Sequence, residues 1–291
     1  MRRMSCFAHT VGWLFCVLPL PGPLQAPVNP FELGRASVAA QAEAQAPAPA
    51  PPDTKGERPG REVFVSWGYN GDSYAKSDMH ISQPSIHNDF TLAGVRARDS
   101  KAWTDLFNHS LFVPQYNIRG GVFFNEKWGL EVALDHMKWI VKQDQEVGVT
   151  GTLNASAVDS RVTLTPDILR YQLNNGANPI FVNLVRRVRL AREPGRTGYL
   201  SFLAKAGGGF AVPHTENVLF GQPNEKGFQF FHGWDLDAAA ALRWHIWRPV
   251  YVEIEEKLLY VRYFGVKVDR GTAGHSVKAN ELSFHFGVAF R

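Results

Sequence analysis

The chain has 291 residues, of which 45% are hydrophobic and 20% are charged, and its formal net charge is +4. The apolar fraction excludes a wholly disordered chain, and two cysteines exclude a disulfide-rich scaffold or a cysteine-based zinc site. The charges are scattered rather than gathered on one basic face, which argues against nucleic-acid binding. No run of about 18 consecutive apolar residues is present, so membrane-spanning helices are not expected.

The N-terminus has the order of a secretory signal peptide. Two arginines give a positive start, residues 11–20 (VGWLFCVLPL) form a short apolar core, and the small-residue stretch SVAAQAEAQA follows. We therefore predict that residues 1–40 direct export through the general secretory route, with cleavage after Ala40 as one plausible site. Both cysteines, Cys6 and Cys16, lie in this segment.

Residues 41–61 (QAEAQAPAPAPPDTKGERPGR) are rich in alanine, proline and charge and contain no bulky apolar side chain. Such a segment has nothing to bury in a core, and its composition predicts a flexible linker. The folded domain is therefore expected to cover residues 62–291.

From residue 62 onward, the hydrophobic pattern repeats every two residues, which is typical of β-strands. In the last segment, Leu282, Phe284, Phe286 and Phe290 share one face, whereas polar and small residues occupy the other. The alternating segments are 62–69, 113–124, 128–141, 180–190, 199–212, 233–246, 250–263 and 281–290. Several of them are long enough to cross a bilayer at a tilt.

The connections between these segments alternate in length. Short connections are expected at 125–127, 192–197 and 247–249, and long ones at 70–112, 142–179, 213–227 and 265–277. Short turns at one end and long loops at the other are typical of outer-membrane barrels. The sequence therefore predicts an all-β fold, an eight-stranded antiparallel up-and-down transmembrane β-barrel with short periplasmic turns and long outer loops.

The polar faces of the predicted strands are unusually rich in charge. Their acidic residues are Glu131, Asp135, Asp235, Asp237, Glu253 and Glu255, and their basic or imidazole residues are Arg119, Lys205, Arg243, Lys257 and His285. Because buried charges must be paired, we expect an ion-paired lumen. An eight-stranded barrel is only wide enough for its own side chains, so an open pore is not expected.

The alternative is a soluble secreted barrel that binds a lipophilic ligand, with its apolar face inward. Aromatic residues flank the apolar runs, as in membrane girdles, and favour the membrane barrel. Glu256 and Arg186 fall on the predicted lipid face, either because of a bulge or because they lie near an interface. The triple glycine 207–209 predicts tight bending or a close approach of strands.

The strand order and the ending LSFHFGVAFR resemble bacterial outer-membrane β-barrels of the eight-stranded, OmpA-like type. The resemblance implies a location in the outer membrane, contact with its lipids and lipopolysaccharide, a monomeric state, and insertion by the barrel assembly machinery. That machinery reads a terminal aromatic residue, and here Phe290 is followed by Arg291.

Three blocks resemble a barrel family that includes the rhizobial lipid A oxidases. They are NEKWGLEVALDHMKW, ILRYQLNNGANPIFVNLVRR and AKAGGGFAVPHTEN. The resemblance implies oxygen-dependent oxidation of the proximal glucosamine of lipid A. The family's second block typically reads Thr-Asp-Gly-hydrophobic-Asn, whereas residues 174–178 read NNGAN and lack the acid.

If the protein is an enzyme, its candidate catalytic residues lie at the bases of the outer loops. They are Asp135, His136, Asn175, Asn178, His214, Glu216 and Asn217. Neighbouring residues on a strand point to opposite sides, so Asp135 is also expected to be an ion-pair partner in the lumen. No cofactor is expected, although His214 and Glu216 could hold a divalent metal with His80, His87 or His109.

The leading functional prediction is a non-enzymatic outer-membrane barrel without a pore, whose outer loops contact the envelope or another surface. Exposed basic residues would then contact lipopolysaccharide phosphates. Those residues are Lys76, Arg96, Arg98, Lys101, Lys142, Lys267 and Arg270. The alternatives are a lipid A oxidase-like enzyme and the soluble ligand-binding barrel.

Overall fold

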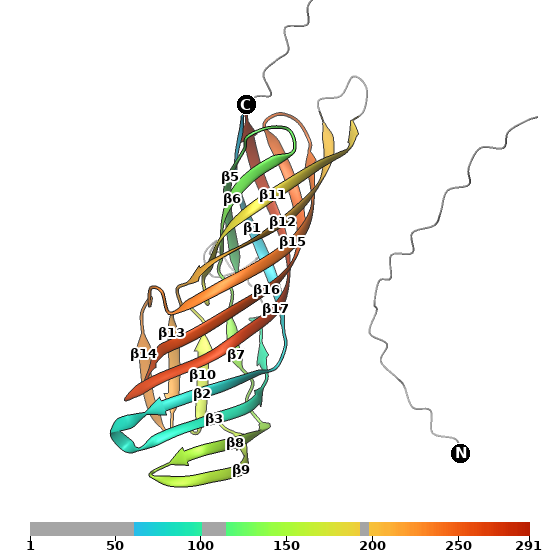
Figure 1. Cartoon of the computed structure of the whole chain (residues 1–291). Coiled ribbons are helices and arrows are strands. Elements are labelled where there is room, and N and C mark those ends of the chain that lie inside the picture. Colours follow the sequence, from blue (N-terminus) through green and yellow to red (C-terminus); the bar gives the residue numbers. More distant parts are fainter. Residues whose placement is uncertain (1–60, 101–114, 193–197) are drawn as a thin grey trace, which may run out of the picture. The chain divides into compact units, whose positions relative to one another are not determined.

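The computed structural model describes residues 61–100, 115–192 and 198–291, which belong to one compact unit (Figure 1). The predicted signal peptide, the linker apart from Arg61, and the candidate residues Lys101 and His109 lie outside the described residues. Within the described ranges, no helix has the length and apolar character that crossing a bilayer requires.

Eight antiparallel strands form a closed barrel. They are β1 (Glu62–Tyr74), β5 (Tyr116–Phe123), β6 (Trp128–Asp135), β11 (Pro179–Arg192), β12 (Tyr199–Ala211), β15 (Gly233–His245), β16 (Val250–Val268) and β17 (Gly271–Phe290). Each strand pairs with the next in this order, and β17 pairs with β1 to close the barrel. The prediction of an eight-stranded antiparallel barrel is confirmed.

One end of the barrel carries the short turns. Four residues, 124–127, separate β5 from β6, and four, 246–249, separate β15 from β16. The third predicted short turn, 192–197, falls almost wholly outside the described residues. We call this end, at which β17 also finishes, the turn end.

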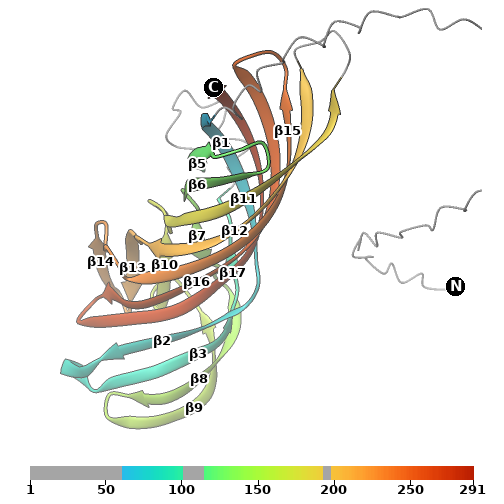
Figure 2. The same ribbon diagram turned by 45° about the horizontal axis from the view of Figure 1, so that its top comes forward.

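The other end carries folded strands rather than long loops. Four strands continue the barrel wall from β17 in the order β2 (Ser77–Gln83), β3 (Asn88–Val95), β8 (Gln145–Leu153) and β9 (Ser156–Leu164). A second sheet has the order β14 (Gln222–Lys226), β13 (Thr215–Leu219), β10 (Leu169–Leu173), β7 (Trp139–Val141) and β4 (Ala97–Arg98). A short 3-10 helix, η1 (Pro84–Ile86), joins β2 to β3. We call these elements together the cap (Figure 2).

Long connections opposite the turn end are confirmed for three of the four predicted segments, 70–112, 142–179 and 213–227, although their described parts fold into the strands of the cap. The prediction for the fourth segment, 265–277, was wrong. In 265–277 the strands of the barrel simply continue, so that β16 ends at Val268 and β17 begins at Gly271. A bulge between Tyr263 and Val266, with Gly265 at φ +60°, shifts the two-residue period and hides this continuation. The predicted strand 128–141 is in turn divided between β6 and β7.

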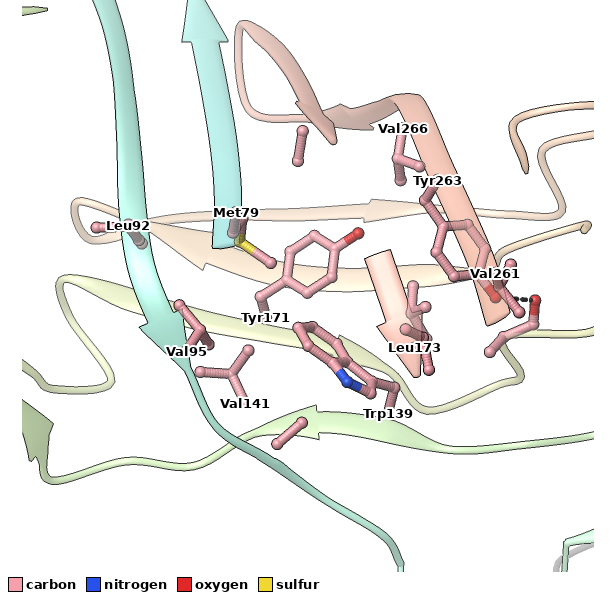
Figure 3. Packing of buried hydrophobic residues seen from close by; sticks show 14 of the residues in the cluster. Met79, Leu92, Val95, Trp139, Val141, Tyr171, Leu173, Val261, Tyr263 and Val266 are labelled. Atoms are coloured by element: carbon pink, nitrogen blue, oxygen red, sulfur yellow. Dashed lines mark hydrogen bonds between the residues drawn. The ribbon is translucent and has the colours of Figure 1, made fainter. Parts of the chain in front are cut away.

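The cap is held together by an apolar core between its two sheets (Figure 3). Met79 and Leu92 from the wall meet Trp139 and Tyr171 from the five-stranded sheet, and all four are 0–2% exposed. Tyr263 joins them from β16 and donates a hydrogen bond from its hydroxyl to the carbonyl oxygen of Ala177, at 2.8 Å. Each large apolar side chain buried here contributes about 1.5–3 kcal/mol, so the cap is a packed structure.

The barrel turns its apolar face outward and its charged face inward. Large apolar side chains that are at least one-third exposed cover its outside and form what we call the belt: Val63, Val65, Ile118, Leu130, Val132, Val182, Leu184, Val188, Leu236, Leu242, Ile254, Leu258, Leu282, Phe284 and Phe286. Trp128, Trp244 and Phe290 are also exposed, close to the turn end. The soluble alternative required the apolar face to point inward, and the structure contradicts it.

Glu256 and Arg186 do lie on the outer face, and neither lies at a bulge. The β15–β16 register is unbroken across Glu256, whose Oε1 accepts a hydrogen bond from Asn280 Nδ2 at 2.9 Å. Arg186 stacks over the Trp128 ring, with its guanidinium carbon 4.9 Å from the ring centroid. A hydrogen bond and a cation–π contact thus accompany the two charges on the outer face.

Gly209 lies where β12 and β11 approach each other closely, as the triple glycine predicts. A Cβ atom built there would collide with the carbonyl oxygen of Ile180. We expect Gly209→Ala to lower the free energy of unfolding by about 1–3 kcal/mol, because the backbone must shift to admit the methyl group. Urea unfolding of the purified protein in detergent micelles measures this effect. Gly120→Ala is the control, because a Cβ at Gly120 meets nothing within 4 Å, and equal midpoints for the two variants would contradict the expectation.

Candidate functional site

The site is built around a tight loop that follows β10. Asn178 adopts a left-handed conformation, with φ 42°, and its Nδ2 donates to the carbonyl oxygens of Gly176 at 3.1 Å and Val212 at 3.0 Å. Gly176 has φ +109°, and a Cβ there would collide with the Asn178 side chain. The NNGAN sequence thus folds into a loop that closes around the side chain of Asn178.

His136, just beyond β6, contacts this loop. Its Nδ1 lies 2.9 Å from Asn178 Oδ1. Because Asn178 Nδ2 already donates to carbonyls, Oδ1 is the acceptor, so His136 Nδ1 carries the proton and Nε2 offers a lone pair. Burial lowers the pKa of His136. The hydrogen bond that His136 donates to Asn178 opposes this shift, and the nearby Lys138 charge adds to it. The ring also stacks on Tyr116, with centroids 4.7 Å apart.

The same loop positions His214 and Glu216. The backbone N–H of His214 donates to the carbonyl oxygen of Gly176 at 3.0 Å. The Glu216 carboxylate accepts hydrogen bonds from Asn175 Nδ2 at 3.2 Å and from Gln172 Nε2 at 2.7 Å. These contacts bring β10, the NNGAN loop and β13 together.

Across the β13–β14 hairpin, Glu225 is the register partner of Glu216. The Oε1 atom of Glu225 lies 4.0 Å from His214 Nε2. His214, Glu216 and Glu225 each offer one ligand atom, and these atoms lie within 4.8 Å of one another. We call these three residues the cap cluster, which is the one such group found among the described residues.

Five of the seven predicted site residues meet in this network: His136, Asn175, Asn178, His214 and Glu216. The structure does not bring the other two, Asp135 and Asn217, to the network. Asp135 points into the barrel, where its Oδ2 pairs with Lys257 Nζ at 2.6 Å. Asn217 alternates with Glu216 along β13 and is buried, and it lines the cleft beside Glu216 and Glu225 without a hydrogen bond to the network.

Of the three first-loop histidines named as possible metal ligands, the structure describes His80 and His87 and places neither of them in the cap cluster. His80 lies on the β2–β3 hairpin, with its Nε2 2.6 Å from Asp89 Oδ1. Sequence reasoning also missed Glu225 and Gln172. Phe220 and Gly221, which both have positive φ, form the two-residue turn between β13 and β14. Recognising this turn in the sequence would have placed Glu225 opposite Glu216.

His275 is a further histidine at the cap that the sequence did not single out. It is fully buried, and its ring stacks on Trp139 and Tyr263, with centroids 4.5 and 5.0 Å apart. Burial lowers its pKa to about 3, with a smaller contribution from Arg262. A neutral histidine among aromatic rings belongs to the packing of the cap core.

Inside the barrel, the expected ion-paired network is present. Arg119 pairs with Asp135 and, at 3.2 Å, with Glu255. Further ion pairs include those of Lys205 with Glu131 at 2.9 Å and with Glu253 at 2.8 Å. Arg243 pairs with Glu253 at 2.5 Å, and Lys257 pairs with Glu281 at 3.7 Å. We call these residues the lumen network.

Three of the residues expected in the lumen network, Asp235, Asp237 and His285, do not join its ion pairs. Asp237 accepts a hydrogen bond from Asn183 Nδ2 at 3.2 Å, and His285 bonds to Ser283 at 2.9 Å. For Asp235 and Asp237, no ion pair is found among the described residues. Pairing is therefore concentrated toward the turn end and middle of the barrel.

An antiparallel eight-stranded barrel that is apolar outside and ion-paired inside has the fold of the bacterial outer-membrane barrels. No protein-family model and no curated protein matches the chain. The lipid A oxidase resemblance therefore stays a prediction.

Several solved barrels are similar in structure. Ail, the attachment invasion locus protein of Yersinia pestis, is 12% identical, with a TM-score of 0.31 over 79% of this chain and 99% of Ail. OprG from Pseudomonas aeruginosa is 9% identical, with a TM-score of 0.34 over 80% and 96% of the two chains. Neisserial surface protein A is 11% identical, with a TM-score of 0.30 over 79% and 97%. Sequence identities and TM-scores this low assign no family, so the fold is assigned from this chain's own strand pairing and burial.

Proposed function

We propose that the protein is an integral outer-membrane barrel that passes no solutes and holds a folded β cap at the cell surface as a binding module. The belt supports the membrane location, because a closed barrel satisfies all its backbone hydrogen bonds internally and can present apolar side chains to lipid. The turn end would face the periplasm and the cap the outside.

The filled lumen supports the absence of a pore. Arg119, Lys205, Lys257, Glu255 and Glu281 are 0–2% exposed, so their side chains occupy the interior that a channel would need. Each of them is also held by at least one ion pair. Opening a path for solutes would separate buried charges, which is strongly unfavourable.

The cap is proposed as the part that meets a partner. Six of the seven basic residues named from the sequence lie on it or at its margins and are exposed: Lys76, Arg96, Arg98, Lys142, Lys267 and Arg270. Arginine and lysine on a packed surface suit the phosphate groups of lipopolysaccharide. The rigid core beneath them lowers the ordering cost of binding.

Liposome swelling tests the first part of this proposal. Full-length protein reconstituted in phospholipid vesicles is expected to give no more swelling in small sugars than empty vesicles do, with a general porin as the positive control. Surface proteolysis of intact cells locates the cap, which is expected to be reached from outside. Swelling at the porin rate, or a cap reached only after the outer membrane is broken, would refute the proposal.

A second candidate function is enzymatic modification of a lipid A-type glycolipid. Its support is the meeting of His136, Asn178, Asn175, His214 and Glu216, together with a solvent-open cleft of about 240 Å³ lined by Arg170 and both cap-cluster glutamates. In such a reaction the neutral His136 would accept a proton at Nε2.

Mass spectrometry of lipid A decides between the two candidates. A deletion strain and its parent are compared, and the deletion is complemented with either the wild-type gene or His136→Ala. A mass difference that matches sugar oxidation or acyl loss, restored only by the wild type, would establish the enzyme. Identical spectra would leave the binding module as the function.

A further inference from the structure

The β13–β14 hairpin places two carboxylates directly opposite each other. Glu216 and Glu225 are register partners, and like charges in such a pair destabilise a hairpin. Among the described residues, the one basic group found within 4.0 Å of either carboxylate is the His214 imidazole, whose Nε2 lies 4.0 Å from Glu225 Oε1. A hairpin with this arrangement would be stabilised by a cation between the two carboxylates.

His214 supplies a third donor, and its position is fixed. Its backbone is held by Gly176, and its ring packs edge-on against Phe228, with centroids 5.3 Å apart. The side chain is only 11% exposed, whereas that of Glu225 is 68% exposed and can rotate. Ligands bound at about 2.0–2.2 Å from a zinc ion lie roughly 3–4 Å apart, so a small rotation of Glu225 brings the three donor atoms into range.

Glu216 is oriented by neutral donors. Gln172 bonds one carboxylate oxygen at 2.7 Å and Asn175 bonds the other at 3.2 Å. Each oxygen keeps a further lone pair for a metal. Groups that hold a ligand in this way commonly fix its geometry in metal sites.

We propose that His214, Glu216 and Glu225 bind one divalent transition-metal ion, with Gln172 and Asn175 as positioning residues. One imidazole and two carboxylates suit Zn²⁺ or Mn²⁺ better than Ca²⁺, which prefers oxygen ligands alone. The two negative charges neutralise the ion. The adjoining cleft leaves its remaining positions open to water or to an anionic group. This inference does not depend on whether the barrel is an enzyme.

Metal titration of the full chain tests the site. Protein purified in detergent and freed of metal with a chelator is titrated with Mn²⁺, followed by electron paramagnetic resonance, and with Zn²⁺, followed by calorimetry. We expect one ion per chain. Glu225→Gln is expected to weaken binding at least tenfold, and Asn175→Ala by about tenfold. Glu146→Gln is the matched control, because Glu146 is an exposed cap carboxylate that pairs with Arg161.

Thermal unfolding separates a metal site from a structural role. In metal-free protein, Glu225→Gln is expected to leave the melting temperature of the cap unchanged or raise it, because a like-charge pair is removed. Added Zn²⁺ should raise the melting temperature of the wild type and of Glu146→Gln but not that of Glu225→Gln or His214→Ala. Unchanged affinity in both cap-cluster variants, or no binding by the wild type, would overturn the proposal.

Discussion

Arg119→Met is expected to lower the free energy of unfolding by about 3–5 kcal/mol, the cost of leaving buried carboxylates without their partner. Arg119 is wholly buried and lies within 4.0 Å of Asp135, Glu255, Glu281 and Glu131. Methionine fills part of the same volume but carries no charge. Lys257 and Lys205 cannot compensate fully, because each is already paired.

Urea unfolding in lipid vesicles, followed by heat-modifiable migration on a detergent gel, measures this loss. Arg161→Met is the matched control, because Arg161 pairs with Glu146 on the cap surface, where the two side chains are 78% and 55% exposed. An exposed pair contributes about 0–1 kcal/mol. If Arg119→Met cost no more than the control, the lumen charges would be solvated rather than buried, and the lumen would be open to water.

The barrel could be predicted from the sequence because its strands keep a two-residue period over most of their length. Leu282, Phe284 and Phe286 face outward, and Glu281 and His285 face inward, as their alternation predicts. The same rule separated Asp135, which enters the lumen network, from His136, which stacks on Tyr116. The two-residue period therefore predicted both which segments form strands and which side chains point into the lumen.

The cap could not be predicted in this way because its strands are short and their partners are distant. The cap strand β2 pairs with β17, almost 200 residues away, and β7 spans only Trp139–Val141. The bulge at Tyr263 and Val266 breaks the period where the barrel wall becomes the cap. Strand pairing, rather than local pattern, decides the fold of this region.

The candidate site could be predicted only in part, because some of its contacts depend on strand pairing. Asn175, Asn178 and His214 came from blocks that resemble a known family, and the structure joins them through Gly176. Glu225 was missed because its relation to Glu216 exists only in the hairpin register. Asn217 alternates with Glu216 along β13 and reaches the adjoining cleft but not the hydrogen-bond network.

The two longest strands connect the lumen network to the cap. Val250–Val268 and Gly271–Phe290 contain 19 and 20 residues. At one end β16 supplies Glu253 and Lys257 to the lumen network, and at the other it supplies Val261 and Tyr263 to the cap core. The cap is thus continuous with the barrel wall, and a ligand on the cap would meet a surface fixed by the barrel strands.

Val132→Arg is expected to destabilise the protein by about 2–4 kcal/mol in a lipid bilayer, the cost of a cationic side chain near the midplane of a membrane barrel. Val132 is 54% exposed and is the register partner of Val182, which is 53% exposed. Along the wall, it lies between Trp128 near the turn end and the stacked rings of Tyr116 and His136 near the cap.

Unfolding in phospholipid vesicles is again the measurement, and Thr163→Arg is the control, because Thr163 is exposed on β9 of the cap. A barrel surrounded by water would tolerate both substitutions equally, since an exposed arginine is solvated there. A barrel surrounded by lipid would tolerate only the second, because an arginine in the hydrocarbon region must draw water or head groups toward itself. Equal stability of the two variants in vesicles would show that the belt does not face lipid, and the outer-membrane proposal would fail with it.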